Sequence, residues 1–383
     1  MMLTDRQDHL YGEQYARLPE DLLAELLSAA PKIATQVKNL LGPALAMKDR
    51  LRQAAVDLDR IVDFSPRSNR TLCGVDGGFA VERTVAVDIA LSVAVGVEGF
   101  APPGGSCAWD DNQYASAYQV LTHDIENERL ARGAMVILEL DVLADAPHEF
   151  RIYDGSHLTP VIQLNSALTS RSQAVTEFTA ELGDKHAVRG AFAAFVTDPN
   201  IVGMPKYDSS RELCNILGAA IGERVPGDDK YLTSLILSGG QFTIPEQVPK
   251  RPWRLLHFTE SGSAVGAAVE LARDLDEALQ PLQDRELFSL YFRPDHVGPA
   301  YRVEVKPDLA HDTDRLADLL TTLAAQITGP FVREPYPQYL ADVMAKSVGF
   351  GLSALQTAAQ LALSRDTPEL AQLVIHSYRT EGT

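Results

Sequence analysis

Hydrophobic and polar positions follow a helical period over residues 19–61. Apolar side chains return every three or four residues there, which predicts amphipathic helices. They are Leu23, Leu26, Leu27, Ile33, Val37, Leu40 and Leu41. Pro31 and Pro43 are expected to break or kink this stretch, because proline removes a backbone donor and clashes with the preceding turn. The pattern fits a helical arm before the main core or an arm that forms a dimer, and spacing alone does not separate the two.

Strands alternate with helices in the rest of the chain. Two runs rich in β-branched residues, CGVDGGFAVERTVAVDIALSVAVGV at residues 73–97, predict a β-hairpin. Helices are expected over residues 122–145 and from Thr159 as N-cap with Pro160 in the first helical position. Further helices are expected after Asp308 and after Pro337. The predicted strands cover residues 150–153, 191–196, 253–258, 287–292 and 301–305. Together these elements predict an α/β protein with a mixed sheet.

Composition describes an ordinary globular protein. A chain of 383 residues exceeds what one hydrophobic core usually holds, and 45% of its residues are hydrophobic. The longest apolar stretch, residues 85–97, is interrupted by Asp88 and is too short to span a bilayer. Cys73, Cys107 and Cys214 are far apart and in no CxxC spacing. They argue against a zinc site, and we expect a cytoplasmic protein without a membrane segment.

The charge balance limits what the surface can bind. With 34 Lys and Arg against 52 Asp and Glu, the formal net charge is −18. Such a surface repels nucleic acid unless a local basic groove or a metal ion offsets it. Any nucleic-acid function must therefore rest on a defined site.

Two Asp-Gly steps raise the question of chemistry. Asp76 in GVDGG and Asp154 in IYDGS each follow a predicted strand. Asp-Gly is a common turn signal, so either residue alone is explained as a turn former. Together they predict two carboxylates at one edge of an α/β sheet, where ligands prefer to bind.

A third carboxylate lies on an apolar stretch. On a helix, Glu139 shares a face with Met135, Val136, Val142 and Leu143. An ionised carboxylate is costly there unless it is paired or bound to a metal. Pairing with an arginine, or a strand in place of the helix, would explain Glu139 without a metal.

Three converging carboxylates describe a site for Mg²⁺ or Mn²⁺. Hard cations take oxygen ligands, and such ions activate water and stabilise the leaving oxygen in phosphodiester cleavage. Ribonuclease-H-like nucleases open with a hairpin whose first strand carries a metal-binding Asp. Lys206, in GMPKYDSS, could contact the scissile phosphate, or it is a solvated loop lysine.

The ordered motifs resemble those of the NurA nuclease family. They are GVDGG before a hairpin, an acidic residue on the next helix, YDGS before another helix, a loop lysine, and YRVEVKP…REPYPQYLADVMAKSV. The resemblance covers roughly residues 71–350. It implies a ribonuclease-H-like mixed sheet core in which Asp76, Glu139 and Asp154 bind the metal ion. It also places Lys206 and Asp342 at the catalytic site.

The C-terminal motif departs from the family pattern. The family usually has a Tyr-Pro pair there and later a His in an Ala-His step. This chain has LAD, so Asp342 stands where the His is expected, and Glu334 or Tyr336 stands at the Tyr position. A His can donate a proton or coordinate as a neutral ligand, whereas an ionised Asp only accepts or coordinates.

The resemblance also implies an activity and partners. It implies a Mn²⁺- or Mg²⁺-dependent DNA nuclease that cuts DNA ends and single strands in end resection, repair or defence. It further implies a homodimer that works with a HerA-type hexameric translocase. The expected division is a helical N-terminal arm over residues 1–70, a nuclease domain over 71–350, and a helical tail over 351–383.

Two other functions stay open on the sequence. An actin-like sugar or carboxylate kinase also has a GxDGG phosphate loop, and LILSGGQF around Gly239 resembles its adenosine motif. Phe79 stands where such kinases need a small hydroxylated residue, which argues against this alternative. A non-catalytic scaffold for an ATPase would require the carboxylates to lie apart.

Overall fold

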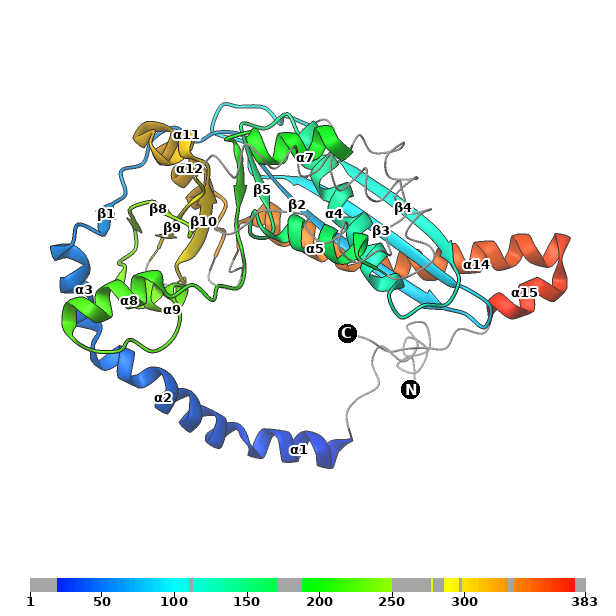
Figure 1. Ribbon diagram of the computed structural model, residues 1–383, viewed down its shortest axis with the longest axis horizontal. Helices are drawn as coiled ribbons and strands as arrows, with labels where there is room; N and C mark the ends of the chain where they lie inside the picture. Colours follow the sequence, from blue (N-terminus) through cyan, green and yellow to red (C-terminus); the bar gives the residue numbers. More distant parts are fainter. Residues whose placement is uncertain are drawn as a thin grey trace, which may run out of the picture.

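The computed structural model describes residues 19–109, 113–170, 188–249, 277, 286–295, 298–329, 332 and 334–375. Figure 1 shows one long sheet with helices packed on it and three helices leading in from the N-terminal side. The strand predicted over residues 253–258 lies outside the described residues.

Ten strands form the sheet. Their order is β1-β7-β9-β10-β6-β5-β2-β3-β4, and β8 pairs with β9. Their bounds are β1 (Ile61–Asp63), β2 (Leu72–Arg83), β3 (Asp88–Glu98), β4 (Tyr114–Leu121), β5 (Phe150–Tyr153), β6 (Ile201–Gly203), β7 (Gln241–Thr243), β8 (Glu246–Gln247), β9 (Phe288–Arg293) and β10 (Tyr301–Val305).

Half of this sheet has ribonuclease-H-like topology. β2, β3 and β4 form an antiparallel meander. β5 then pairs with β2 in parallel, and β6 pairs with β5 in parallel. The order β6-β5-β2-β3-β4 is that of the ribonuclease-H-like core, so this predicted fold class is confirmed. The other strands extend the same sheet, because β10 pairs with β6.

Helices cover the sheet and connect its strands (Figure 1). Their bounds are α1 (Glu20–Ser28), α2 (Ala30–Ala46), α3 (Lys48–Asp57), α4 (Asn127–Asp145), α5 (Thr159–Leu168), α7 (Val188–Thr197), α8 (Glu212–Ile221), α9 (Asp229–Ile236), α11 (Pro307–Ala310), α12 (Thr313–Ala325), α13 (Tyr336–Lys346), α14 (Val348–Asp366) and α15 (Pro368–Ile375). Among the described helices, none is long and apolar enough to cross a membrane.

The Asp-Gly-Gly step lies inside a strand. β2 continues past Asp76 and stays paired with β3 as far as Arg83 opposite Asp88. The prediction that the strand ends at Asp76 is therefore wrong on the β3 side. On the other side, pairing with β5 ends at Val75 opposite Tyr153. Asp76 is thus the first residue of β2 whose backbone has lost its β5 neighbour, which leaves room for a site there.

Glycines let helices approach β2 on both faces. A Cβ on Gly77 would lie 2.6 Å from Glu139 Oε1 of α4, and one on Gly78 would lie 2.2 Å from the Ala345 carbonyl oxygen of α13. Successive strand residues face opposite sides of a sheet, so α4 and α13 lie on opposite faces. A Cβ on Gly74 would also meet α13, at 2.7 Å from Gln338 N. Glycine is therefore needed at these positions because the helices pack so closely on β2. It is not needed there to form a turn.

Two sequence predictions of local structure need correction. Residues 191–196 belong to helix α7, and the strand follows as β6 (Ile201–Gly203). A short apolar run suits a buried helix and a buried strand equally well, so its pattern does not separate them. α5 starts with Thr159 inside the helix and Leu158 as N-cap. Of the two prolines expected to break or kink the N-terminal stretch, Pro31 lies in the first turn of α2, directly after the end of α1, and Pro43 lies inside α2 without ending it.

The N-terminal helices join the body at their far end. Leu51 and Ala55 of α3 are buried in a cluster with residues of α8 and α9. In contrast, most apolar side chains of α1 and α2 are exposed, and Leu27 is 65% exposed and Leu40 68%. The division into an arm over residues 1–70, a domain over 71–350 and a tail over 351–383 stays a prediction.

We expect Gly78→Ala to destabilise the protein by about 1–3 kcal/mol, because the new methyl group would overlap backbone atoms of α13. Urea unfolding followed by circular dichroism measures this. Gly42→Ala is the matched control, since Gly42 lies in α2 with nothing within 4 Å of a Cβ. That variant is expected to be as stable as the wild type or slightly more stable. Equal stability of the two variants would contradict the close packing of α13 on β2.

Candidate metal centre

Three aspartates meet where β2 and β5 diverge. Asp76, Asp154 and Asp342 each offer a carboxylate oxygen, and these oxygens lie within 4.8 Å of one another. Asp76 lies on β2, Asp154 directly follows β5, and Asp342 lies on α13. Parallel neighbouring strands bring the first two to the same level of the sheet, and the docking of α13 on Gly74 and Gly78 adds the third.

Lys206 lies among these carboxylates. Its Nζ is 2.6 Å from Asp154 Oδ2, 2.8 Å from Asp342 Oδ1 and 3.4 Å from Glu334 Oε2. The residue follows β6, the next strand along the sheet. The structure thus brings four of the five predicted site residues together, with Glu334 as an additional acidic neighbour.

Glu139 lies beside the cluster on the other face of β2. It belongs to α4, as predicted, and only 3% of it is exposed. The trio of aspartates that could share an ion does not include it. Its carboxylate has a hydrogen bond with Tyr153, and its Oε2 has no partner among the described residues.

Sequence reasoning missed two residues that support the cluster. Gln338, on the first turn of α13, donates from Nε2 to Asp154 Oδ1 at 2.8 Å. Tyr153 contacts Glu139 from the residue before Asp154. Nothing in the sequence near Gln338 points to this role, because its partner is 184 positions away. Tyr153 could have been found from its place in IYDGS.

The cluster carries more negative charge than its lysine balances. Burial, together with Asp154 and Glu139, raises the pKa of Asp76 to about 9. Burial and Asp154 raise the pKa of Glu139 to about 8. Burial also acts on Asp342, but hydrogen bonds from Lys206 and Lys346 hold its pKa below its usual range. Asp76 and Glu139 would therefore be protonated at neutral pH unless another cation joined Lys206.

This donor set fits a hard divalent cation. All the candidate ligands are carboxylate oxygens, which Mg²⁺ and Mn²⁺ prefer. Within the described part of the chain, Glu139 Oε2 is buried without a hydrogen-bond partner, and Glu334 Oε2 has only its 3.4 Å ion pair with Lys206. A cation would relieve the repulsion that raises the pKa of Asp76.

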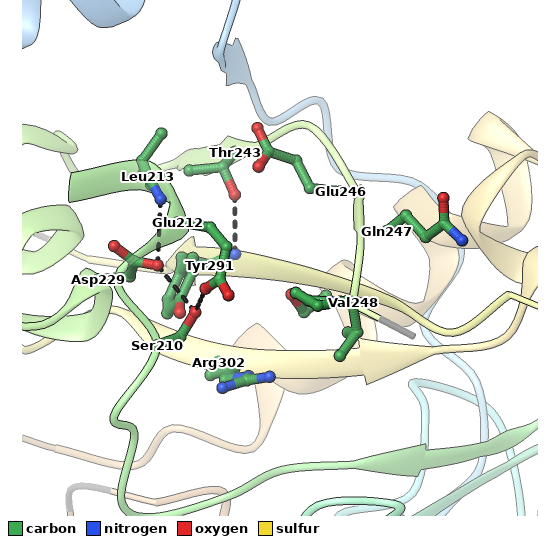
Figure 2. Close-up of a pocket in the computed structure, with 12 residues that line it drawn as sticks. Ser210, Glu212, Leu213, Asp229, Thr243, Glu246, Gln247, Val248, Tyr291 and Arg302 are labelled. Atoms are coloured by element: carbon green, nitrogen blue, oxygen red, sulfur yellow. Dashed lines mark hydrogen bonds between the residues drawn. The ribbon is translucent and has the colours of Figure 1, made fainter. Parts of the chain in front are cut away.

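A small cavity lies away from the aspartates, between α8 and the strands β8 and β9. It measures about 30 Å³ and is lined by Ser210, Asp229, Thr243, Tyr291 and Arg302 among others (Figure 2). Asp229 is occupied with the start of α8, where its Oδ1 accepts from the backbone of Cys214 at 2.8 Å. A volume of this size holds about one water molecule, which is too little space for a ligand.

The sheet order and the acidic cluster define a ribonuclease-H-like α/β protein with a candidate metal centre. No family model matches the sequence, and no curated protein matches it. Among solved structures, the chain is similar to the NurA nuclease from Sulfolobus solfataricus, with a TM-score of 0.54 and 12% identity over 91% of this chain and 98% of that chain. A structure of NurA with manganese has a TM-score of 0.47 and 13% identity over 86% of this chain and 98% of that chain, too low a score to support a conclusion. The first similarity shows that this chain has the NurA fold.

The cluster predicts how stability depends on pH in the absence of metal. The pKa of Asp76 is raised to about 9, so the folded protein holds its proton more tightly than the unfolded chain does. This contribution to stability is complete below the usual aspartate pKa of about 3.9 and is lost as the pH rises towards about 9. In EDTA at pH 8, we expect Asp76→Asn to be more stable than the wild type by about 1–2 kcal/mol.

Urea unfolding at pH 5 and pH 8 tests this. The gain of Asp76→Asn should be smaller at pH 5, and Asp63→Asn, which alters an exposed carboxylate on β1, should change little at either pH. If the stability gained by Asp76→Asn did not differ between the two pH values, the ionised Asp76 carboxylate would not be what destabilises the wild type at high pH.

Proposed function

We propose that this protein is a Mn²⁺- or Mg²⁺-dependent DNA nuclease that hydrolyses phosphodiester bonds at DNA ends and in single strands. The observation that carries the proposal is the meeting of Asp76, Asp154 and Asp342 around Lys206, at the point in the sheet where the pairing of β2 with β5 stops. The fold shared with the NurA nuclease from Sulfolobus solfataricus supports it.

Each residue of the candidate metal centre has its own proposed role. Asp76, Asp154 and Asp342 would hold the ion, and Glu139 would add negative charge from the neighbouring face of β2. A bound divalent ion supplies an activated water and stabilises the leaving oxygen. Gln338 fixes the orientation of the Asp154 carboxylate through its 2.8 Å hydrogen bond. Lys206 can donate to a phosphate oxygen and offset the charge that develops there.

Asp342 is the feature that differs from the family pattern. One of its carboxylate oxygens lies within 4.8 Å of those of Asp76 and Asp154. The family motif has a His at this position. Its carboxylate accepts from Lys206 at 2.8 Å and from Lys346 at 2.7 Å. An ionised Asp cannot donate a proton, so proton donation to the leaving oxygen would fall to Lys206 or to water.

The geometry argues against the kinase alternative. A phosphate loop needs exposed glycine backbone in a turn, but the glycines of GVDGG lie inside β2 and are covered by α4 and α13. The hairpin turn itself follows Arg83, several residues later. The scaffold alternative requires separated carboxylates, whereas these three share one small volume.

The proposed partner protein is the one that the resemblance to the NurA nucleases implies, and the charge of this chain is consistent with it. With a net charge of −18, the protein has little general attraction for DNA. A HerA-type hexameric translocase would therefore supply much of the binding to DNA. We place the pair in the cytoplasm, in end resection and repair or in defence against foreign DNA. Co-elution of the protein with a HerA-type ATPase tests the partnership, and separate elution at micromolar concentrations would contradict it.

We expect a homodimer in solution. The exposed leucines of α1 and α2 form an apolar stripe that a second copy would cover; they include Leu22, Leu23, Leu26, Leu27 and Leu40. Light scattering should give twice the mass of one chain. Replacing Leu27 and Leu40 with Gln should weaken the dimer and leave the fold intact. A concentration-independent monomer would rule out this part of the proposal.

Cleavage of labelled single- and double-stranded DNA tests the activity directly. We expect cleavage with Mn²⁺ or Mg²⁺ and none with EDTA. Asp76→Asn should lower the rate at least about 100-fold, since replacing even an outer neighbour of a metal site typically costs 10–100-fold. Asp63→Asn is the control and should cleave like the wild type. Metal-dependent cleavage at the wild-type rate by pure, folded Asp76→Asn would remove Asp76 from the site.

A further inference from the structure

We propose that Tyr207 and Lys230 form a subsite for single-stranded DNA beside the metal centre, in which a base stacks on Tyr207 and a phosphate binds Lys230. The inference rests on the proposed function, and it names the residues that would favour an unpaired strand. Neither residue was singled out by the sequence motifs.

A cleft connects these residues to the metal centre. Its volume is about 390 Å³, and its lining includes Lys206, Tyr207, Lys230, Tyr301, Glu334 and Gln338. Lys206 and Gln338 both contact Asp154, so one end of the cleft lies at the candidate ligands. A strand whose scissile phosphate meets Lys206 would therefore continue past Tyr207 and Lys230.

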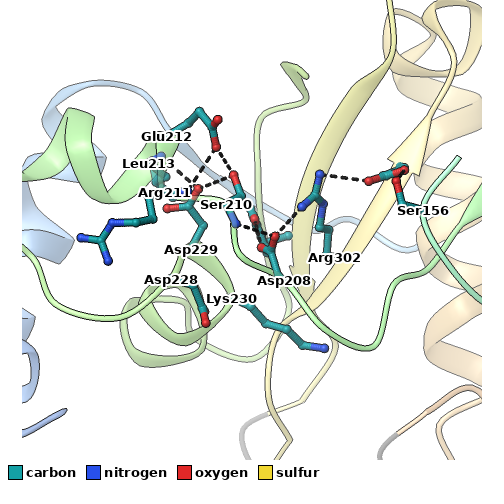
Figure 3. A network of polar contacts seen from close by, with 12 residues as sticks. Ser156, Asp208, Ser210, Arg211, Glu212, Leu213, Asp228, Asp229, Lys230 and Arg302 are labelled. Carbon is teal, nitrogen blue, oxygen red and sulfur yellow. Dashed lines mark hydrogen bonds and ion pairs between the residues drawn. The ribbon is translucent and has the colours of Figure 1, made fainter. Parts of the chain in front are cut away.

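Tyr207 is presented to solvent on an anchored loop. The residue is 92% exposed. The side chain of its neighbour Asp208 is buried and accepts a hydrogen bond from the hydroxyl of Tyr291. It also accepts one from the guanidinium of Arg302 (Figure 3). On the other side, the carbonyl oxygen of Lys206 accepts from Lys230 Nζ at 2.7 Å. Since both neighbours are held, the backbone of Tyr207 is fixed beside the cleft, and its ring lines the cleft while remaining almost fully exposed.

An exposed ring in this position suits an unpaired base. Every base has a π-face, so stacking on an aromatic side chain tolerates any sequence. In a duplex the bases already stack on one another, so only a single strand can offer one to Tyr207. Single exposed aromatic residues are common on protein surfaces, but this one combines a fixed loop, a cleft and two lysines.

Lys230 can contact the backbone of the same strand. It extends from α9 with its ammonium pointing away from Asp229 (Figure 3). The Lys206 carbonyl uses one of its three N–H donors, which leaves two for a phosphate in the cleft. The short distance between Lys230 and the Lys206 backbone places this positive charge next to the proposed point of cleavage.

Binding measurements on matched variants test the subsite. All proteins carry Asp76→Asn, so that the strand is not cut, and bind a fluorescent 15-nucleotide single strand in an anisotropy titration. Tyr207→Ala should raise Kd about 10-fold, and Tyr207→Phe, which keeps the ring, should stay within about twofold of the parent. Tyr118→Ala is the control, because Tyr118 is 65% exposed on β4 and lies outside the cleft lining.

Two further experiments test stacking and the phosphate contact separately. On an abasic strand of equal length, Tyr207→Ala and its parent should bind equally, since no base remains to stack. Lys230→Gln should lower the slope of log K against log salt by about 0.7, the value for one phosphate contact on a single strand.

The outcomes distinguish this inference from the proposed function. If the wild type cuts DNA and Tyr207→Ala leaves Kd unchanged, or loses the same affinity on the abasic strand, the subsite is wrong and the nuclease proposal stands. If the parent binds no single strand and the wild type cuts no DNA, both are overturned.

Discussion

Close contact between β2 and the helices on its two faces is the constraint on which the site depends. Gly77 leaves space for the Glu139 carboxylate of α4, while Gly74 and Gly78 leave space for the backbone of α13. Any side chain at these positions would push a helix away from the strand. Since α13 carries both Asp342 and Gln338, the approach that the glycines permit is also what completes the cluster of carboxylates.

That approach concentrates negative charge at a cost to stability. Asp76 and Glu139 are buried near Asp154, and their pKa values rise to about 9 and about 8. Lys206 offsets only part of this charge, although it contacts Asp154, Asp342 and Glu334. Carboxylates that repel one another destabilise a protein core, but they bind a divalent cation well. Such an arrangement is therefore typical of a place where a cation binds.

A buried ionic network holds the loops of the site in register. Arg302 of β10 pairs with Asp208 in the loop after β6 and, at 2.9 Å, with Glu304. Glu304 in turn accepts from the backbone of His157 at 2.9 Å, in the loop after β5. The loops that carry Asp154 and Lys206 are thus both tied to β10. Burying these charges is tolerable because each has a partner of opposite charge or a hydrogen-bond donor.

The sequence by itself determined the elements whose periodicity is long and clear. The hairpin of β2 and β3, the helix that carries Glu139 and the strand before Asp154 were all predicted, and the order of motifs pointed to the ribonuclease-H-like core. It also predicted that Asp76 and Asp154 lie close together, and they do so where the pairing of β2 with β5 stops, although β2 itself continues to Arg83. The short apolar run that became α7 was predicted as a strand, since six apolar residues suit either form of buried backbone.

Only the tertiary structure decided how the side chains of the site meet. Asp342 and Lys206 are separated by 136 positions, yet they meet at 2.8 Å because α13 and the loop after β6 pack against the same end of β2 and β5. Local patterns carry no information on such a contact, which depends on how helices dock. The same holds for Asp-Gly-Gly: as a local signal it favours a turn, and only the helices packed on both faces of β2 explain why those glycines stand inside a strand.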